Sequence, residues 1–318
     1  MTAFVTFLSS AFRLSSTFLY GSTGEVITEK SGHLNLGIPG VMSVGAAVGC
    51  LAVYKLLKAG VESAFALVFV PVLATLVAGG IMGLIYSFIT VSLRSNQNVT
   101  GLALTTLGVG LAGHFMNGIK SDVMILGRAS KYYANLFHIS GHNWFTQIFL
   151  SHGILVYLAI IIAIVTQVIL NRTRIGLHLR AVGESPATAD AAGINVTAYK
   201  YVATIIGSAI AGLGGLFTIM DYMGGNWEYI LEGFGWLSIA LVIFTLWRPA
   251  LAIPGSIIFG GLYIAASYIG GITFAQIELI KMLPYAMTIV VLIATSILGS
   301  KKAQPPASLG LNYFREER

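Results

Sequence analysis

The sequence predicts an all-α membrane protein, a polytopic bundle of about eight to ten hydrophobic helices. Two observations predict this fold class. The chain has 318 residues, of which 56% are hydrophobic and only 9% are charged, whereas a soluble domain carries roughly a quarter charged residues. With a mean hydropathy of +0.83, too few ionic side chains remain to build a water-facing surface, so the excess apolar surface is expected to face lipid.

Charge-free windows locate the expected spans, because a bilayer core needs roughly 20 apolar residues and a central charge costs about 2.5 to 3.5 kcal/mol. Residues 3–20 are apolar apart from Arg13, and no small-residue cleavage site follows, so this segment is expected to stay as a helix. The window Gly233 to Trp247 is short for a span, and those from Ser63 and Tyr132 could each hold a re-entrant piece. The charge-free windows are Ser31 to Tyr54, Ser63 to Leu93, Ser95 to Ile119, Tyr132 to Asn171, Tyr201 to Met220, Gly233 to Trp247, Pro249 to Ile277 and Met282 to Ser300.

The distribution of basic residues predicts the orientation. The net charge is +6, and Lys and Arg gather in cytoplasmic loops of membrane proteins, so no nucleic-acid partner is needed to explain it. With the C-terminus in the cytoplasm, one side receives Lys30, Arg94, Arg172, Arg174, Arg180, Lys200, Arg248, Lys301, Lys302, Arg315 and Arg318. The other side receives fewer: Lys55, Lys58, Lys120, Arg128, Lys131 and Lys281. This bias predicts an external N-terminus and a cytoplasmic C-terminus.

Catalytic and metal chemistry are not indicated. Cys50 is the single cysteine and lies in an apolar run, which indicates packing and not redox chemistry. No HExxH, GxSxG or P-loop motif occurs, so we expect no enzyme activity and no ATP hydrolysis by this chain. The histidines are scattered without a convincing ligand set: His33, His114, His138, His142, His152 and His178.

Small residues recur at every fourth position and predict close helix packing. Gly79 and Gly83 form one pair, Gly45 and Gly49 another, and Gly207, Ala211 and Gly215 make a stripe. Such spacing lets helix backbones approach closely in lipid, where no hydrophobic force drives association.

The basic loop from Asn171 to Lys200 contains the signals of a separate short helix. Ser185 is a good N-cap, Pro186 suits the first helical position and Gly193 suits the residue after the end. Thr197 could cap the next membrane helix. A helix of about two turns cannot span a bilayer and is marginal alone in water. It is either a docking element at the membrane surface or an ordinary capped loop.

Three separated runs carry a resemblance to a known family: Arg180 to Pro186 continuing as Ala191 to Asn195, Gly24 to Gly37, and Pro306 to Gly310 with Tyr313, Arg315 and Glu316. The first resembles the cytoplasmic signature of ABC importer permeases of the branched-chain amino acid and ribose type. The other two are similar to that superfamily's nucleoside branch, which works with lipoproteins of the basic membrane protein family. The matches occur in the right order and the similarity covers most of the chain.

The resemblance implies a division of labour in the bacterial plasma membrane. Two permease chains, often different ones, would form the path, separate ATPase subunits would bind ATP and Mg²⁺, and an external lipoprotein would deliver substrate. This chain would be one permease half, with a transmembrane domain at 1–300, a coupling loop at 171–200 and a cytoplasmic tail at 301–318. It needs no cofactor of its own. Its ATPase-coupling residues would be Arg180, Gly183, Glu184, Pro186, Asp190 and Gly193.

One departure from the family pattern concerns the start of a membrane segment. Nucleoside permeases commonly have Asn-Ile-Gly-Ile-Glu-Gly where this chain has proline at position 39. Pro39 favours a kinked or broken helix near the cytoplasmic end. Asn35 could then face the path or be a structural amide. Trp227 and Trp236 belong to a polar and aromatic cluster on the expected outer side, which is either a substrate mouth or an interfacial aromatic belt.

Other transport functions remain as alternatives. A permease for ribose, another small sugar or an amino acid would share the coupling segment, and the Thr28 to Gly37 run favours nucleosides. An ion-coupled secondary transporter normally needs an ionisable residue at mid-membrane. Only Arg13 falls inside an expected span, and no acid does.

Overall fold

The computed structural model describes residues 2–119, 123–139, 141, 143–228, 230–298 and 304–314. His142, Lys120, Lys301, Lys302, Arg315, Glu316 and Arg318, which entered the sequence predictions, lie outside these residues. The described helices are α1 (Thr2–Glu29), α2 (Ile38–Lys58), α3 (Ala64–Ser87), α4 (Gln97–Asn117), α5 (Val123–Asn135), α6 (Trp144–Phe149), α7 (Ile154–Arg172), α8 (Arg174–Glu184), α9 (Pro186–Ala191), α10 (Val196–Phe217), α11 (Leu231–Phe244), α12 (Pro249–Ala265), α13 (Phe274–Lys281) and α14 (Leu283–Leu298). The π-helical turns η1 (Phe88–Ser92) and η3 (Thr218–Tyr222) extend α3 and α10, and the 3-10 turn η4 (Ala266–Tyr268) extends α12.

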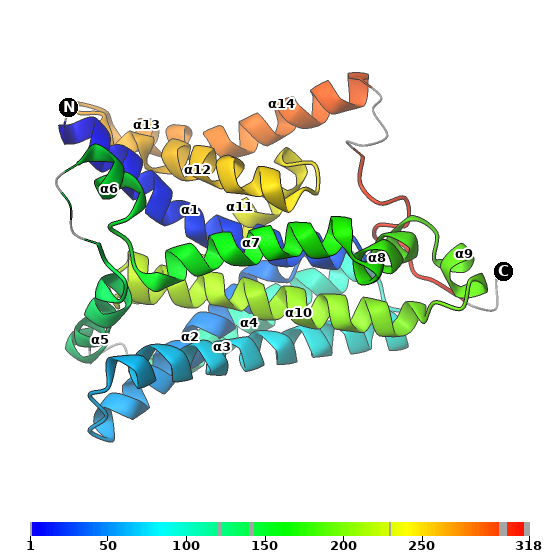
Figure 1. The fold of residues 1–318 in the computed structure, drawn as a ribbon, viewed down its shortest axis with the longest axis horizontal. Coiled ribbons are helices and arrows are strands. Elements are labelled where there is room, and N and C mark those ends of the chain that lie inside the picture. The colour runs from blue at the N-terminus through cyan, green and yellow to red at the C-terminus, as the bar shows by residue number, and fades with distance from the viewer. Residues whose placement is uncertain are drawn as a thin grey trace.

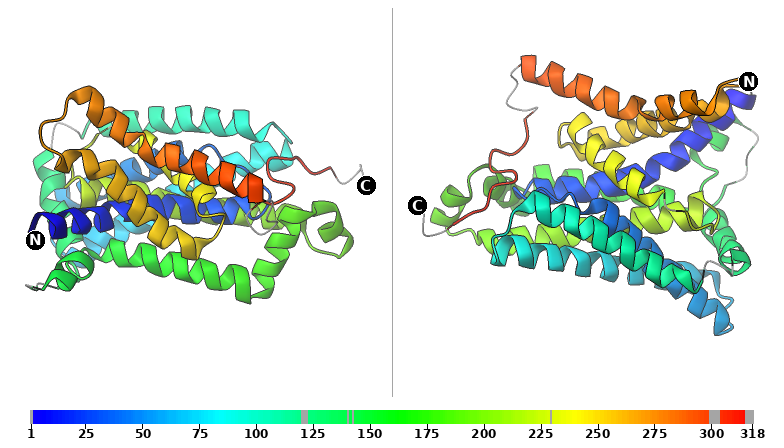
Figure 2. Two further views of the ribbon diagram at one scale, coloured as in Figure 1. Left: turned by 90° about the horizontal axis from the view of Figure 1, so that it is seen from above. Right: turned by 180° about the vertical axis from the view of Figure 1, so that it is seen from behind.

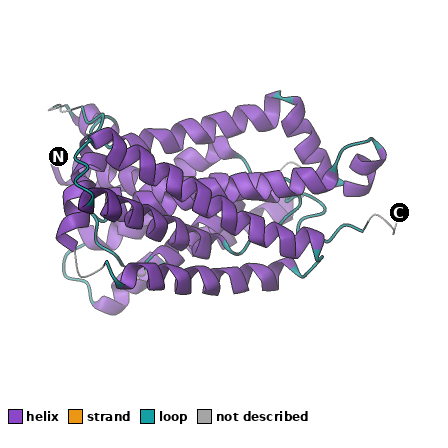
Figure 3. Cartoon of the chain, turned by 90° about the horizontal axis from the view of Figure 1, so that it is seen from below, coloured by secondary structure: helices purple, strands orange, loops and turns teal. Residues whose placement is uncertain are grey.

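The predicted fold class is confirmed, since the described chain is a helical bundle without strands whose long helices run side by side (Figures 1 and 3). Among the described residues, seven segments are long and apolar enough to cross a membrane. They are Ile38–Lys58, Ala64–Ser92, Gln97–Asn117, Ile154–Arg172, Val196–Tyr222, Pro249–Tyr268 and Phe274–Ile297. The bundle also contains α1, which has 28 residues but is more polar, and α11, which has only 14 residues.

Helix α1 is the central element of the bundle. It packs against α7, α10, α11 and α12 (Figure 2). Some of its buried hydroxyl side chains hydrogen-bond to carbonyls of the preceding turn: Ser15 Oγ donates to Phe12 O at 2.7 Å, and Thr28 Oγ1 donates to Gly24 O at 3.3 Å. The expected segment 3–20 was therefore too short. The helix continues to Glu29 because it is enclosed by other helices and not by lipid.

Close backbone contacts confirm the prediction from the small-residue stripes. A Cβ added to Gly45 would lie 2.6 Å from the Cα of Gly212, so α2 and α10 touch at their backbones. A Cβ on Gly79 would lie 2.6 Å from the Ser208 carbonyl oxygen, which joins α3 to the same helix. Only glycine allows this approach, and α10 accordingly packs on α1, α2 and α3.

Two expected windows do not coincide with single helices. The window from Tyr132 to Asn171, which was long enough to hold a further piece, contains the end of α5, the short helix α6 and the membrane helix α7. The window from Ser31 begins with a loop, and α2 begins only at Ile38. Pro39 therefore lies in the first turn of α2 and does not kink it, since the first turn has no intrahelical partner for the missing N–H.

Candidate functional site

The 171–200 loop folds into two short helices and not one. The sequence prediction identified α9 but missed α8, whose start is signalled by Thr173. The Thr173 hydroxyl accepts a hydrogen bond from the Gly176 N–H at 3.2 Å, which caps the new helix directly after α7. Leu179 and Val182 on one face of α8 are buried. An amphipathic pattern beginning at Thr173 was the signal that could have located this helix.

The predicted caps of α9 are confirmed. Ser185 Oγ accepts from the Thr188 N–H at 3.4 Å, and Pro186 occupies the first turn. Gly193 has φ +82°, and its N–H donates to Asp190 O at 3.0 Å. This left-handed residue ends the helix with a Schellman pattern. The expected cap of the following helix was wrong: α10 is capped by Asn195, whose Oδ1 accepts from Ala198 N–H at 2.9 Å, and not by Thr197.

The C-terminal segment 306–313 ties α8 and α9 to the rest of the bundle. Ser308 N–H donates to Gly183 O at 3.0 Å, and Gly310 N–H donates to Gly32 O at 3.2 Å. Farther along, the Tyr313 hydroxyl donates to Asp190 Oδ2 at 2.9 Å. The segment therefore joins the end of α8, the loop after α1 and helix α9.

The structure places the six expected coupling residues on one continuous surface element. Gly183 packs directly on the loop after α1, because an added Cβ would lie 2.4 Å from the Lys30 carbonyl oxygen. Glu184 Oε2 accepts from Ala307 N–H at 3.4 Å, and Arg180 Nε donates to Gly176 O within α8 at 3.4 Å. The remaining three residues, Pro186, Asp190 and Gly193, shape α9 and its end. The element projects from one end of the bundle (Figure 1).

Two buried carboxylates lie at the same end of the bundle, on α1. Glu25 Oε1 accepts from the Asn35 N–H at 2.9 Å, and Glu29 Oε2 accepts from the Trp247 indole N–H. Asn35 Oδ1 in turn accepts from Gly37 N–H at 2.9 Å. Asn35 is fully buried in this network, and its Nδ2 has no hydrogen-bond partner among the described residues, so its amide is only partly satisfied. Glu25 and Glu29 thus fasten the loops after α1 and α11 to the core.

A partly buried ion pair lies toward the other end of the bundle. Arg13 Nε donates to Asp221 Oδ1 at 2.8 Å, and Asp221 is 1% exposed within the apolar segment Val196–Tyr222. The expectation that no acid lies inside a membrane span was therefore wrong for Asp221. Charge-free windows could not find this acid, because burial among helices and not sequence position makes a charge tolerable.

The expected pathway residues belong to three different surroundings. Trp227 follows η3 and packs against one hydrophobic cluster, whereas Trp236 on α11 packs against another. Asn35 belongs to the Glu25 network, and the next residue, Leu36, packs against the same cluster as Trp236. The coupling residues, in contrast, lie in one segment of the chain. Within the described residues no group of three or more His, Cys, Asp or Glu side chains could hold a metal ion.

Comparison with known proteins gives the family. Residues 7–292 match the family described as the branched-chain amino acid transport system / permease component. This chain belongs to that family. The permease is 30% identical over 311 residues, 95% of each chain, to the nucleoside ABC transporter permease NupC of Lactococcus lactis subsp. cremoris. It is thus a transport subunit of an ABC transporter and a multi-pass protein of the cell membrane.

Two further relatives are named as permeases for different cargoes. The guanosine ABC transporter permease NupQ of Bacillus subtilis is 29% identical, over 93% of this permease and 92% of the relative. The putative glucose ABC transporter permease TsgC13 of Haloferax volcanii is 31% identical, over 80% of this permease and 74% of the relative. The nucleoside relatives therefore match more of the chain than the sugar relative does.

Proposed function

We propose that this permease forms half of the translocation path of an ATP-driven importer for nucleosides. The observation that carries this proposal is the match to a nucleoside permease over 95% of both chains. A guanosine permease that matches over more than nine-tenths of each chain supports the same cargo. The second candidate is a small sugar such as glucose or ribose, which the glucose relative favours.

The 171–200 loop is proposed as the contact with the ATPase subunits. Its two helices are capped at both ends, packed on the loop after α1 through Gly183 and tied to the C-terminal segment through Asp190. A short helix held in this way can transmit the rigid-body motion of an ATPase dimer to the membrane helices. Arg180, Gly183, Glu184, Pro186, Asp190 and Gly193 would carry this contact, with ATP and Mg²⁺ bound by the separate ATPase subunits.

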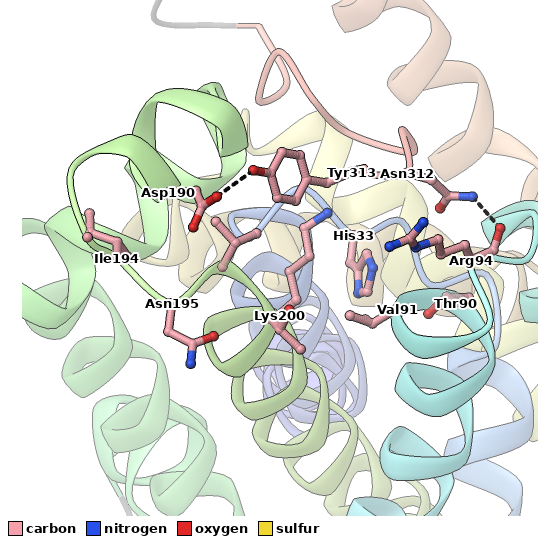
Figure 4. Close-up of a pocket in the computed structure, with 13 residues that line it drawn as sticks. His33, Thr90, Val91, Arg94, Asp190, Ile194, Asn195, Lys200, Asn312 and Tyr313 are labelled. Atoms are coloured by element: carbon pink, nitrogen blue, oxygen red, sulfur yellow. Dashed lines mark hydrogen bonds between the residues drawn. The ribbon is translucent and has the colours of Figure 1, made fainter. Parts of the chain in front are cut away.

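The proposed orientation places the α8 and α9 end in the cytoplasm. Arg172, Arg174 and Arg180 lie at the end of α7 and on α8, and Lys30 packs against Gly183 at the end of α8. Arg94 and Lys200 line a pocket together with Asp190 of α9 (Figure 4). Arg248 follows Trp247, whose indole bonds Glu29 at the end of α1. Under the positive-inside rule, this grouping supports a cytoplasmic position for the C-terminal segment. The opposite end, with Trp227 and Trp236, would face an external substrate-binding lipoprotein. A second, different permease chain would complete the path.

Uptake measurements test the cargo and the energy source. Labelled adenosine, uridine, ribose and glucose are offered to cells with and without the permease, before and after ATP depletion. We expect permease-dependent uptake of nucleosides that stops when ATP is depleted, with unlabelled nucleosides competing better than either sugar. Ribose or glucose outcompeting every nucleoside would overturn the cargo, and uptake that survives ATP depletion but collapses with the ion gradient would overturn the ATP-driven mechanism.

A further inference from the structure

A polar pocket of about 470 Å³ opens at the α8 and α9 end of the bundle (Figure 4). Five parts of the chain that are distant in sequence line it: the loop after α1, the end of η1 with Arg94, helix α9 and the turn after it, the start of α10, and the C-terminal segment. The glutamates of α1 and the Arg13–Asp221 ion pair do not belong to its lining. The pocket is therefore distinct from both buried networks described above.

Lys200 is the unusual residue of this pocket. It is only 2% exposed, yet it lies on the pocket lining and its ammonium group points into the cavity (Figure 4). Within the residues that the structure describes, no hydrogen bond or ion pair compensates this ammonium group. An ammonium group withdrawn from bulk water is unfavourable without a counter-charge, so this position favours a bound anion.

The surroundings of Lys200 add to the positive potential. Arg94 lines the opposite wall, where its guanidinium lies 5.0 Å from the Phe314 ring centroid. Residues 195–197, which begin the 22-residue helix α10, also line the pocket, and the N-terminal end of a helix attracts anions. The acid on the lining, Asp190, has Oδ2 engaged by the Tyr313 hydroxyl at 2.9 Å.

His33, on the floor of the pocket, adds no charge. Burial lowers the pKa of His33 well below its usual range, and the nearby Lys200 charge lowers it further. The neutral ring lies 3.4 Å from Thr204 Oγ1 through its Nδ1. The anion would thus be bound by fixed cations and the α10 N-terminus and not by a protonated histidine.

The volume of the pocket limits the class of ligand that it can bind. A cavity of about 470 Å³ lies within the range of small-molecule sites, roughly 300 to 1,000 Å³, and greatly exceeds what one inorganic ion fills. Tyr313 supplies an aromatic ring and Ile194 and Val196 supply apolar contacts beside the cations. We propose that this pocket binds a phosphate ester of nucleotide size. The site goes beyond the proposed transport function and does not depend on which cargo is carried.

The phosphate group bound in this pocket could belong to a soluble phosphate ester or to the headgroup of an anionic lipid. Titration calorimetry and thermal unfolding distinguish these two ligands. The full-length permease in nanodiscs of zwitterionic lipid is titrated with AMP and with inorganic phosphate. In a second arm, thermal unfolding is compared between zwitterionic nanodiscs and nanodiscs containing phosphatidylglycerol. We expect saturable AMP binding that weakens with added NaCl and is at least about tenfold weaker in Lys200→Met, because a charge-assisted contact to phosphate is lost.

Arg174→Met is the matched control, since Arg174 is an exposed cation at the same end but outside the pocket. A Lys200-dependent stabilisation by phosphatidylglycerol without AMP binding would support the phosphate site and assign it to lipid. Arg94→Gln provides an independent variant if Lys200→Met does not fold, and it should weaken AMP binding as well. Equal effects of Arg174→Met and of the pocket variants, or no phosphate-dependent effect in either arm, would overturn the proposal.

Discussion

The Tyr313 hydroxyl donates a hydrogen bond of 2.9 Å to Asp190 Oδ2 and thereby joins the C-terminal segment to helix α9. The two residues are separated by most of the second half of the chain, so this contact forms only in the folded bundle. It belongs to a series of bonds in which the same segment also reaches Gly183 and Gly32. The C-terminal segment thus determines where α9 lies relative to α1.

Tyr313→Phe should loosen α9 without removing the aromatic packing of the ring. The lost bond goes to a carboxylate but lies at a partly exposed position, so we expect a loss of about 1 kcal/mol in unfolding free energy. If the proposed coupling role is correct, ATP-driven uptake should fall severalfold. Thermal unfolding in detergent and transport assays measure both effects. Tyr285→Phe, which removes only a weak 3.4 Å contact on the other side of the bundle, is the control; an equal effect of both variants would contradict this prediction.

Gly183→Ala should disrupt the contact between α8 and the loop after α1. The new Cβ would lie 2.4 Å from the Lys30 carbonyl oxygen, a backbone atom that cannot rotate away. Forcing the two elements apart should cost about 1 to 3 kcal/mol. Unfolding should occur at a lower temperature, and uptake should be lost while the chain still inserts in the membrane. Gly110→Ala in α4 is the matched control, because its Cβ would meet no atom within 4 Å. Wild-type stability and uptake in Gly183→Ala would refute the close contact.

Arg13→Met should destabilise the bundle more than Asp221→Asn does. Removing Arg13 leaves the Asp221 carboxylate buried without a counter-charge, whereas Arg13, with 34% of its side chain exposed, can reach solvent when Asp221 is neutral. A fully buried broken pair costs about 3 to 5 kcal/mol, so we expect about 2 to 3 kcal/mol for Arg13→Met after allowing for this exposure. The double variant should recover most of the loss. Chemical unfolding of the wild type, the two single variants and the double variant gives the free energies of a double-mutant cycle. Equal losses of unfolding free energy in the two single variants would contradict the argument.

Acidification should destabilise the protein through His33. Burial, reinforced by Lys200, lowers the pKa of His33 well below its usual range in the folded state, whereas the unfolded chain titrates near about 6.5. The unfolded state therefore binds more protons, and stability decreases as pH falls below about 6.5, by up to about 1.4 kcal/mol per pH unit. The unfolding free energy should be measured between pH 7.5 and 5. His33→Gln should lessen the decrease in unfolding free energy with falling pH. The same decrease in this variant as in the wild type would show that other groups cause it.

The helical spans were predictable because each depends on local composition. Apolar windows such as Pro249 to Ile277 locate helices wherever lipid contact requires apolar side chains. The small-residue pairs Gly45/Gly49 and Gly79/Gly83 marked the contacts of α10. Ser185, Pro186 and Gly193 likewise predicted the bounds of α9, since a cap acts on backbone groups only a few residues away. The coupling role of that helix remains a prediction.

The sequence by itself thus determined a membrane bundle with one short capped helix beyond α7, because solvent and backbone chemistry act on each segment separately. Only the tertiary structure decided where the charged groups lie. Glu29 reaches the Trp247 indole, Arg13 pairs with Asp221, and Lys200 lines a pocket together with the C-terminal segment. Each of these depends on residues far apart in the chain, and a buried charge is tolerable only where the complete fold supplies its partner or a cavity for one.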